Sequence, residues 1–161
     1  MGGSGIAAGA EMDRDEFTET VKAKAEGNFR THGHLAAVVV AVQPTGLTAE
    51  LLPMDDKDES ARLIQRFRAT SSLVAVVTEA WYVDLTKLAP AQQNRAMNTP
   101  PSEHPKRQEV AVVTVYAGFR VTMHAADIIR KGRRKPVLGP WKLMPSTEAG
   151  GRFAVPPADW N

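Results

Sequence analysis

Apolar residues recur at every fourth position near the start of this chain and gather into β-branched runs further along. The first pattern forms one stripe of a helix. Its members are Phe17, Val21, Ala25 and Phe29. Before the stripe, Asp13 and Glu16 resemble a capping box, with Asp in place of the usual Ser or Thr. We therefore predict a helix over residues 14–30, with Gly33 as a left-handed cap that ends it.

The next segments predict a β-hairpin and a second helix. A β-branched apolar run over residues 35–43 and a partly alternating run over residues 47–52 flank a Pro-Thr-Gly turn, which is typical of a hairpin. Acidic side chains over residues 55–59 favour the start of a helix, because they interact well with its dipole. The apolar stripe that follows consists of Leu63, Ile64 and Phe67. We expect this helix to end near Thr70.

The rest of the chain predicts strands and one long polar loop. The strand-like segments cover residues 73–85, 109–117, 119–129 and 137–144. Gly118 separates the middle two as a tight turn or a bulge, and Gly139-Pro140 interrupts the last. Residues 86–107 contain four prolines and form a loop that is long enough to be functional or mobile.

The order of these elements predicts the fold class. It is α-β-β-α-β-β-β, and hairpins join strands where a parallel sheet would need helical crossovers. We therefore expect an α+β fold, with a mainly antiparallel sheet of about five to six strands and two helices packed on one face.

Length and composition fit a single globular domain. The chain has 161 residues, of which 43% are hydrophobic and 24% charged, enough for a sizeable core. We expect a flexible leader over residues 1–12, one α+β domain over residues 13–148 and a loosely ordered tail over residues 149–161. No signal-peptide pattern, no apolar stretch of roughly 18 residues and no cysteine is found. These features predict a soluble, cytoplasmic protein without disulfides or thiolate zinc sites.

Charge is divided unevenly along the chain, although its net value is only +2. Residues 1–60 carry 5 basic and 11 acidic side chains, a net charge of −6. Residues 61–161 carry 15 basic and 7 acidic side chains, a net charge of +8. Such a division could steer an anionic partner or let two copies meet head to tail. The two halves could equally interleave in space, and the division would then disappear on folding.

Glu79 is the only acid within the apolar segment of residues 72–83. A period of two places Glu79 and Trp81 on the same face as core residues of that strand. A carboxylate in this position needs a partner, and two interpretations are open. It is a base or ligand with a raised pKa, or a structural acid paired with Arg107 or Arg120. Trp81 is likewise either a stacking platform for a ligand or part of the core.

Imidazoles and one acid suggest a metal site. The candidates are His32, His34, Glu103 and His104. The first two lie on one side of an extended segment, and the other two could approach from the long loop. The alternative is that the His-Gly-His segment only ends the first helix. There is no HExxH, and nothing in the spacing distinguishes these residues from histidines scattered by chance. We expect His124 on an exposed strand face.

Motifs for nucleophilic or nucleotide chemistry are incomplete. Ser102 lies two residues from His104, but residues that are adjacent in sequence are poor evidence for a catalytic triad. The chain contains no GxxxxGK[ST] motif and no GxGxxG motif after a strand, so a phosphate-binding loop is not indicated.

The densest charge run in the chain is basic. It consists of Arg130, Lys131, Arg133, Arg134 and Lys135. At the tip of a hairpin this run could contact a phosphate backbone in a nonspecific, salt-sensitive manner. The alternative is a solubilising turn that also protects a sheet edge, because no RNP-like or helix-turn-helix pattern accompanies the run.

Four short motifs follow one another along the chain. They are Gly33-His34, Thr78-Glu79-Ala80-Trp81, the Pro-Ser-Glu-His-Pro-Lys-Arg segment of residues 101–107, and Gly139-Pro140-Trp141. With these motifs, the segment from His32 to Trp141 resembles a small uncharacterised α+β domain family of bacterial and phage genomes. The resemblance implies no activity. It implies that functional or partner-binding positions lie among Glu79, Trp81, Ser102, Glu103, His104 and Arg107, since packing alone hardly explains short polar motifs in a variable sheet.

Together these observations predict a non-enzymatic interaction protein of bacterial or phage origin. We expect it to present a sheet face or the long loop to a protein partner or to a second copy of itself, without a cofactor. The first alternative is a nucleic-acid-associated accessory factor that uses the basic run of residues 130–135. The second is a metal-dependent hydrolase built on the four metal candidates.

Overall fold

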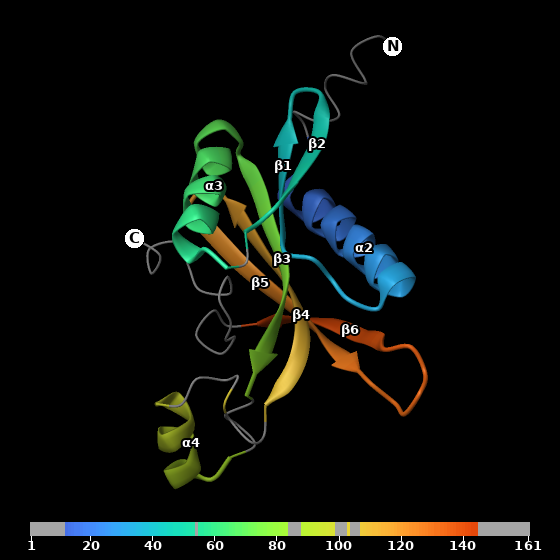
Figure 1. Cartoon of the computed structure of the whole chain (residues 1–161). Helices are drawn as coiled ribbons and strands as arrows, with labels where there is room; N and C mark the ends of the chain where they lie inside the picture. Colours follow the sequence, from blue (N-terminus) through green and yellow to red (C-terminus); the bar gives the residue numbers. More distant parts are fainter. Residues whose placement is uncertain (1–11, 54, 84–87, 99–102, 104–106, 145–161) are drawn as a thin grey trace.

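The computed structural model describes residues 12–53, 55–83, 88–98, 103 and 107–144, and Figure 1 shows how its elements are arranged. The helices are α2 (Arg14–His32), α3 (Lys57–Thr70) and α4 (Pro90–Met97). The strands are β1 (Val38–Gln43), β2 (Gly46–Leu51), β3 (Leu73–Tyr82), β4 (Gln108–Ala117), β5 (Arg120–Ile129) and β6 (Val137–Met144).

The strands form one antiparallel sheet in the order β2-β1-β3-β4-β5-β6. Gln43 and Gly46 close the β1–β2 hairpin on either side of a two-residue turn. After α3 the chain returns as β3 between β1 and β4, and β4, β5 and β6 continue as a meander. This confirms the α+β fold and the antiparallel sheet, in which β2 and β6 form the edges.

The two long helices lie on opposite faces of the sheet, so the expectation that both pack on one face was wrong (Figure 1). Phe17 of α2 shares one core cluster with Ala75 of β3, whereas Ile64 of α3 shares another with Val74. Successive side chains of a strand point to opposite faces. Because β3 is apolar at both sets of positions, both of its faces need a cover, and each helix provides one.

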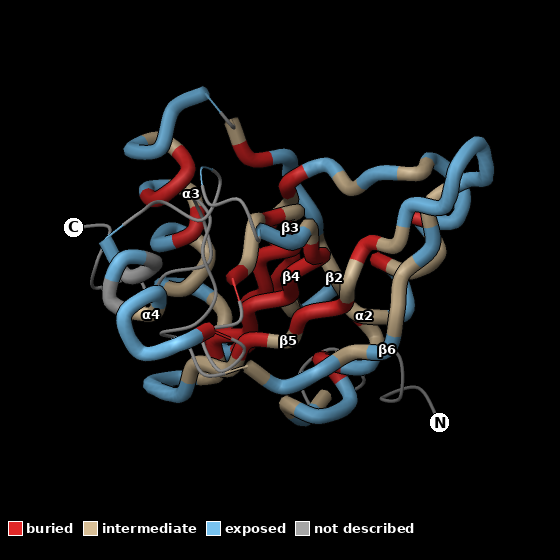
Figure 2. The backbone as a smooth tube through the Cα atoms, turned by 90° about the horizontal axis from the view of Figure 1, so that it is seen from below, coloured by how far each residue is buried: buried red, intermediate tan, exposed pale blue. Residues whose placement is uncertain are grey.

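Burial is greatest at the centre of the sheet and falls toward its edges, as Figure 2 shows. Every residue of β4 from Val110 to Tyr116 is buried. In contrast, β2 is exposed over residues 49–51, and β6 has no buried residue. The edge strands therefore carry much of the accessible surface of the sheet.

The ends of α2 agree with the sequence prediction. Asp13 Oδ1 accepts the backbone N–H of Glu16 at 2.7 Å, which caps the first turn. Gly33 adopts a φ of 75° and donates its backbone N–H to Phe29 at 2.7 Å. This left-handed conformation is one that glycine adopts without the steric cost of a Cβ atom.

Helix α4 lies within residues 86–107, which the sequence predicts as a polar loop. Pro90 is in its first turn, where a missing N–H removes no helical hydrogen bond. Leu88, just before the helix, is buried together with Val83. The sequence prediction missed this helix because the segment contains four prolines. The helix begins at Pro90 and ends before the next proline, Pro100.

The predicted leader and tail lie almost wholly outside the described residues. The exception is Met12, which is half-buried and packs against the core on the α2 side of the sheet. Among the described residues, no helix is both long and apolar enough to cross a membrane.

Candidate functional site

Glu79 lies on β3, on the α2 side of the sheet and just beyond the part of the strand that α2 covers. Its side chain is half-buried, and its Oε2 accepts the backbone N–H of Leu35 at 2.8 Å. Leu35 belongs to the segment between α2 and β1, so the carboxylate ties this segment to the sheet. Arg120, one of the two expected partners, lies at the far end of β5, because β4 and β5 pair Ala111, the neighbour of Glu79, with Ala126.

Trp81 and Glu109 lie opposite each other on β3 and β4. The Arg107 guanidinium stacks over the Trp81 ring, with its Cζ 4.9 Å from the ring centroid. Glu109 Oε2 accepts a hydrogen bond from Arg130 Nε at 2.6 Å. This hydrogen bond is the largest cause that raises the pKa of Arg130, and the negative charges of Glu109 and Glu79 raise it further. Three strands therefore bring carboxylate, indole and guanidinium groups together at one end of the sheet.

A shallow pocket of about 280 Å³ opens among these side chains. It is lined by Leu35, Thr78, Glu79, Ala80, Trp81 and Glu109. The volume lies just below the range of about 300–1,000 Å³ that is usual for small-molecule sites. The pocket is therefore better suited to hold one side chain of a partner protein than to enclose a metabolite.

The structure brings together three of the six residues that the resemblance singles out. These are Glu79, Trp81 and Arg107. Glu103 is exposed, and Ser102 and His104 lie outside the described residues. A functional role for the six residues therefore stays a prediction.

The proposed metal ligands are only partly described. His32 and His34 are exposed on either side of the α2 cap, with their ring centroids 6.1 Å apart. Within the part of the chain that the structure describes, no group of three His, Asp or Glu side chains could hold a metal ion. The full set with Glu103 and His104 stays a prediction, because His104 lies outside those residues.

His124 is half-buried beneath α2, so its expected place on an exposed strand face was wrong. It pairs with Val113, which belongs to the core on the α2 side. Burial lowers the pKa of His124, and the nearby positive charge of Lys22 lowers it further. The polar neighbours of His124 on β5 suggested a solvated face, but α2 covers that part of the strand.

The basic run lies on the turn between β5 and β6, and all five of its cations are exposed. Arg130 is held by Glu109, so it belongs to the cluster around Trp81 and not to the open part of the turn. At the other end of the run, Pro136 lies beside Gly33, where α2 ends. The turn and the C-terminal end of α2 are therefore neighbours.

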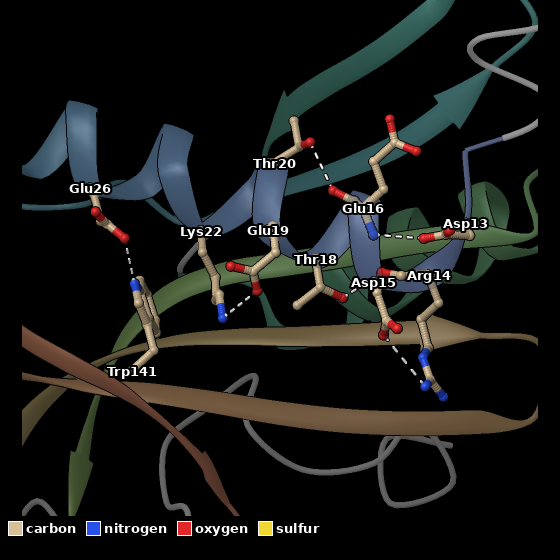
Figure 3. A network of polar contacts seen from close by, with 10 residues as sticks. All are labelled: Asp13, Arg14, Asp15, Glu16, Thr18, Glu19, Thr20, Lys22, Glu26 and Trp141. Carbon is tan, nitrogen blue, oxygen red and sulfur yellow. Dashed lines mark hydrogen bonds and ion pairs between the residues drawn. The ribbon is translucent and has the colours of Figure 1, made fainter.

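A pocket of about 490 Å³ lies between α2 and β6, next to this turn. Its wall includes Arg30 in the last turn of α2, Lys135 from the basic run and the ring of Trp141. The Trp141 Nε1–H donates to Glu26 Oε1 at 2.8 Å, as Figure 3 shows. Sequence reasoning did not propose Arg30 or Trp141 as site residues. The only signal for the latter was the Gly-Pro-Trp motif.

Sequence reasoning also missed a surface along the edge of the sheet at β2. Among the described strands, β2 pairs only with β1. A groove of about 500 Å³ runs beside it, between α2 and the hairpin. The hairpin side of this groove contains Thr48 but is otherwise apolar, with Val38, Val40, Leu47, Ala49 and Leu51. Leu51 is 70% exposed, and it belongs to this apolar wall and is not an isolated surface residue.

Comparisons with protein-family models, with curated proteins and with solved structures found no match for this chain. The resemblance to a bacterial and phage domain family therefore stays a prediction that rests on its short motifs.

Proposed function

We propose that this chain is a protein-interaction domain that binds by strand addition at the β2 edge, and that its partner there is a second copy of the chain. The observation that carries the proposal is the combination of an edge that pairs with no further described strand and apolar side chains beside a groove. Strand addition uses such an edge: main-chain hydrogen bonds supply affinity, and alternate side chains supply specificity.

The free hydrogen-bonding groups of β2 belong to alternate residues. Gln43 and Gly46 are the directly paired residues that close the hairpin, and hydrogen-bonded and non-hydrogen-bonded pairs alternate from there. Leu47, Ala49 and Leu51 are therefore the residues whose N–H and C=O groups point away from β1. A new strand would bond to these three residues without disturbing the hairpin.

The β2 sequence is complementary to itself in one antiparallel register. A two-fold axis at Ala49 places Leu47 opposite Leu51 of the second copy, and Thr48 opposite Glu50 of the second copy. Leucine pairs then continue the apolar face on the α2 side, and Thr48 can donate a hydrogen bond to the Glu50 carboxylate. No like charges lie directly opposite each other, an arrangement that would destabilise the pairing.

This register also covers apolar surface. Leu47, Ala49 and Leu51 lie on the α2 side of the hairpin, because Leu47 packs against the α2-side core and side chains alternate along a strand. Leu51, now largely exposed, would contact Leu47 of the second copy. The leucine side chains of the two hairpins would then meet across the axis and join the two grooves.

The other edge of the sheet is less suited to pairing. β6 contains Pro140, which has no N–H, and its register with β5 shifts between Ala126 and Ile128. Proline and irregular registers are usual protections of an edge strand. β2 contains neither a proline nor a lysine. The contrast supports β2 as the interacting edge.

The test is the mass of the protein in solution, measured by sedimentation velocity over a wide range of concentrations. We expect a dimer for the wild-type chain and a monomer for Ala49→Pro, since proline removes the N–H that bonds across the axis in both copies. The matched control is Ala49→Ser, which keeps this N–H and should remain a dimer. Thermal melting should show that Ala49→Pro is folded, because that N–H makes no bond to β1.

Amide hydrogen exchange locates the interface. In the dimer, the N–H groups of Leu47, Ala49 and Leu51 should be protected, and Ala49→Pro should lose this protection at the other two. A wild-type chain that stays monomeric at every concentration would refute the proposal. A dimer that Ala49→Pro leaves intact would place the interface elsewhere and would refute it as well.

A further inference from the structure

Positive charge gathers where the basic turn meets the C-terminal end of α2. The cations are Arg30, Lys131, Arg133, Arg134 and Lys135. All are exposed, and among the described residues none forms an ion pair. The last carbonyl groups of α2 offset only about half an elementary charge. Most of this charge is therefore uncompensated, and its mutual repulsion favours binding of an anion.

The same region contains a pocket with an aromatic wall. Its volume of about 490 Å³ is within the usual range for ligand sites, about 300–1,000 Å³. The hydrogen bond from Trp141 to Glu26 holds the indole in one orientation between β6 and α2 (Figure 3). Arg30 and Lys135 line the pocket beside this ring. An aromatic surface and two cations thus converge on one space.

We infer that this surface binds single-stranded nucleic acid. One base enters the pocket and stacks on Trp141, and the phosphates on either side of that base contact Arg30 and Lys135. Arg133 and Arg134 on the turn extend the contact along the backbone. Stacking on an aromatic ring combined with cations that follow the backbone is the general mode of single-strand binding.

Other anionic partners use only part of this arrangement. Duplex DNA keeps its bases stacked inside the helix, so it could reach the turn but could not fill the pocket. An acidic peptide would satisfy the cations, but a carboxylate in the pocket would face the carboxylate of Glu26, which lines it. A neutral base avoids this repulsion while its phosphates remain at the basic rim.

This site is separate from the edge that the proposed dimer uses. The pocket lies against β6, at the opposite edge of the sheet from β2. Nucleic-acid binding therefore does not depend on self-association, and Ala49→Pro should bind single strands as the wild-type chain does. Failure of one proposal leaves the other standing.

The test is fluorescence anisotropy with a labelled oligothymidylate of about 12 nucleotides, titrated with the full chain at several salt concentrations. Comparison probes are the same strand in a blunt duplex and unlabelled polyglutamate as a competitor. We expect the single strand to bind more tightly than the duplex. Affinity should fall with salt, with a slope of about −0.7 in log–log form for each phosphate that the protein neutralises.

Two charge-reversal variants test the cations. Arg30→Glu with Lys135→Glu alters the pocket rim, and Arg133→Glu with Arg134→Glu alters the turn. Each pair should weaken binding by about tenfold or more at low salt and reduce the magnitude of the salt slope by about 0.7 for each phosphate that is no longer neutralised. The matched control is Arg66→Glu with Arg120→Glu, which changes the net charge equally on exposed residues away from the pocket. It should leave affinity within about twofold.

The base stacking has its own readout. Trp141→Ala should weaken binding roughly 5- to 160-fold, the range for the loss of one stacked base. Because this variant also loses the bond to Glu26 and could fail to fold, a second measurement uses Trp81→Phe with Trp160→Phe. This chain keeps Trp141 as its only tryptophan, and oligothymidylate should quench its fluorescence as binding proceeds.

Each of five results would overturn the inference. The first four are no binding of the single strand, equal losses in the rim and control variants, duplex binding as tight as single-strand binding, and a Trp141 signal unchanged at saturation. Competition by polyglutamate as strong as that by unlabelled oligothymidylate would also overturn it, since the surface would then be a general polyanion site.

Discussion

Two buried threonines on neighbouring strands offer a sharp test of how this core is built. Thr78 of β3 and Thr114 of β4 are 3% and 1% exposed. The Thr78 hydroxyl donates to the Glu79 carbonyl oxygen at 3.1 Å, whereas the Thr114 hydroxyl has no hydrogen-bond partner among the described residues. We expect Thr114→Val to stabilise the protein and Thr78→Val to leave its stability unchanged or lower it.

The magnitude follows from what each substitution removes. A buried hydroxyl without a partner costs about 1–3 kcal/mol in mutational data, so its removal at Thr114 should raise the free energy of unfolding by about 1 kcal/mol. The Thr78 hydrogen bond contributes a net stabilisation of about 1 kcal/mol, which Thr78→Val removes. Both variants gain the same methyl group, so that contribution cancels in the comparison. The two variants should therefore differ by about 2 kcal/mol.

Urea unfolding followed by circular dichroism measures this difference. With a slope of about 2 kcal/mol per molar, the midpoints of the two variants should differ by about 1 M. The wild-type midpoint should lie below that of Thr114→Val and at or above that of Thr78→Val. If Thr114→Val lowers the midpoint as far as Thr78→Val does, the Thr114 hydroxyl has a partner in the folded protein and the reasoning is wrong.

Two further predictions concern Glu79 and His124. Glu79→Ala should lower the free energy of unfolding by about 1–2 kcal/mol in urea titrations, because it leaves the Leu35 N–H unpaired. Glu79→Gln keeps an acceptor and should lose less than half of that; equal losses would show that the hydrogen bond is not the cause. Burial lowers the folded-state pKa of His124. The stability that the neutral imidazole contributes is therefore present above a pH of about 6.5 and is lost as the pH falls toward the folded-state pKa. Urea midpoints at about pH 7.5 and pH 5.5 should therefore differ less in His124→Gln than in the wild-type chain, and parallel changes would contradict this.

Local features of the fold could be predicted because residues a few positions apart decide them. The Asp13 cap, the Gly33 cap and the four-residue apolar stripe of α2 all depend on contacts within one or two turns. The hairpin turn at Gln43 and Gly46 is equally local. Helix α4 is the exception, since its sequence resembles a loop and only the fold shows it as helical.

The candidate sites were predictable only in part. A period of two placed Glu79 and Trp81 on one face of β3, and the motif containing Arg107 was visible in the sequence. No local pattern shows that Trp81 lies opposite Glu109, because the register of β3 and β4 is set across a long connection. The bond between Trp141 and Glu26 joins residues 115 positions apart. Hydrophobic periodicity carries no information about a pairing over that distance.

The sequence by itself determined the six strands and the helices α2 and α3, where most of them begin and end, and that the sheet is antiparallel. Only the tertiary structure decided that α2 and α3 cover opposite faces, that His124 lies beneath α2, and that β2 and β6 are the edges. The physical reason is the range of the forces involved. Sterics and backbone hydrogen bonds act within a few residues, whereas burial of a sheet that is apolar on both faces depends on which distant segments meet there.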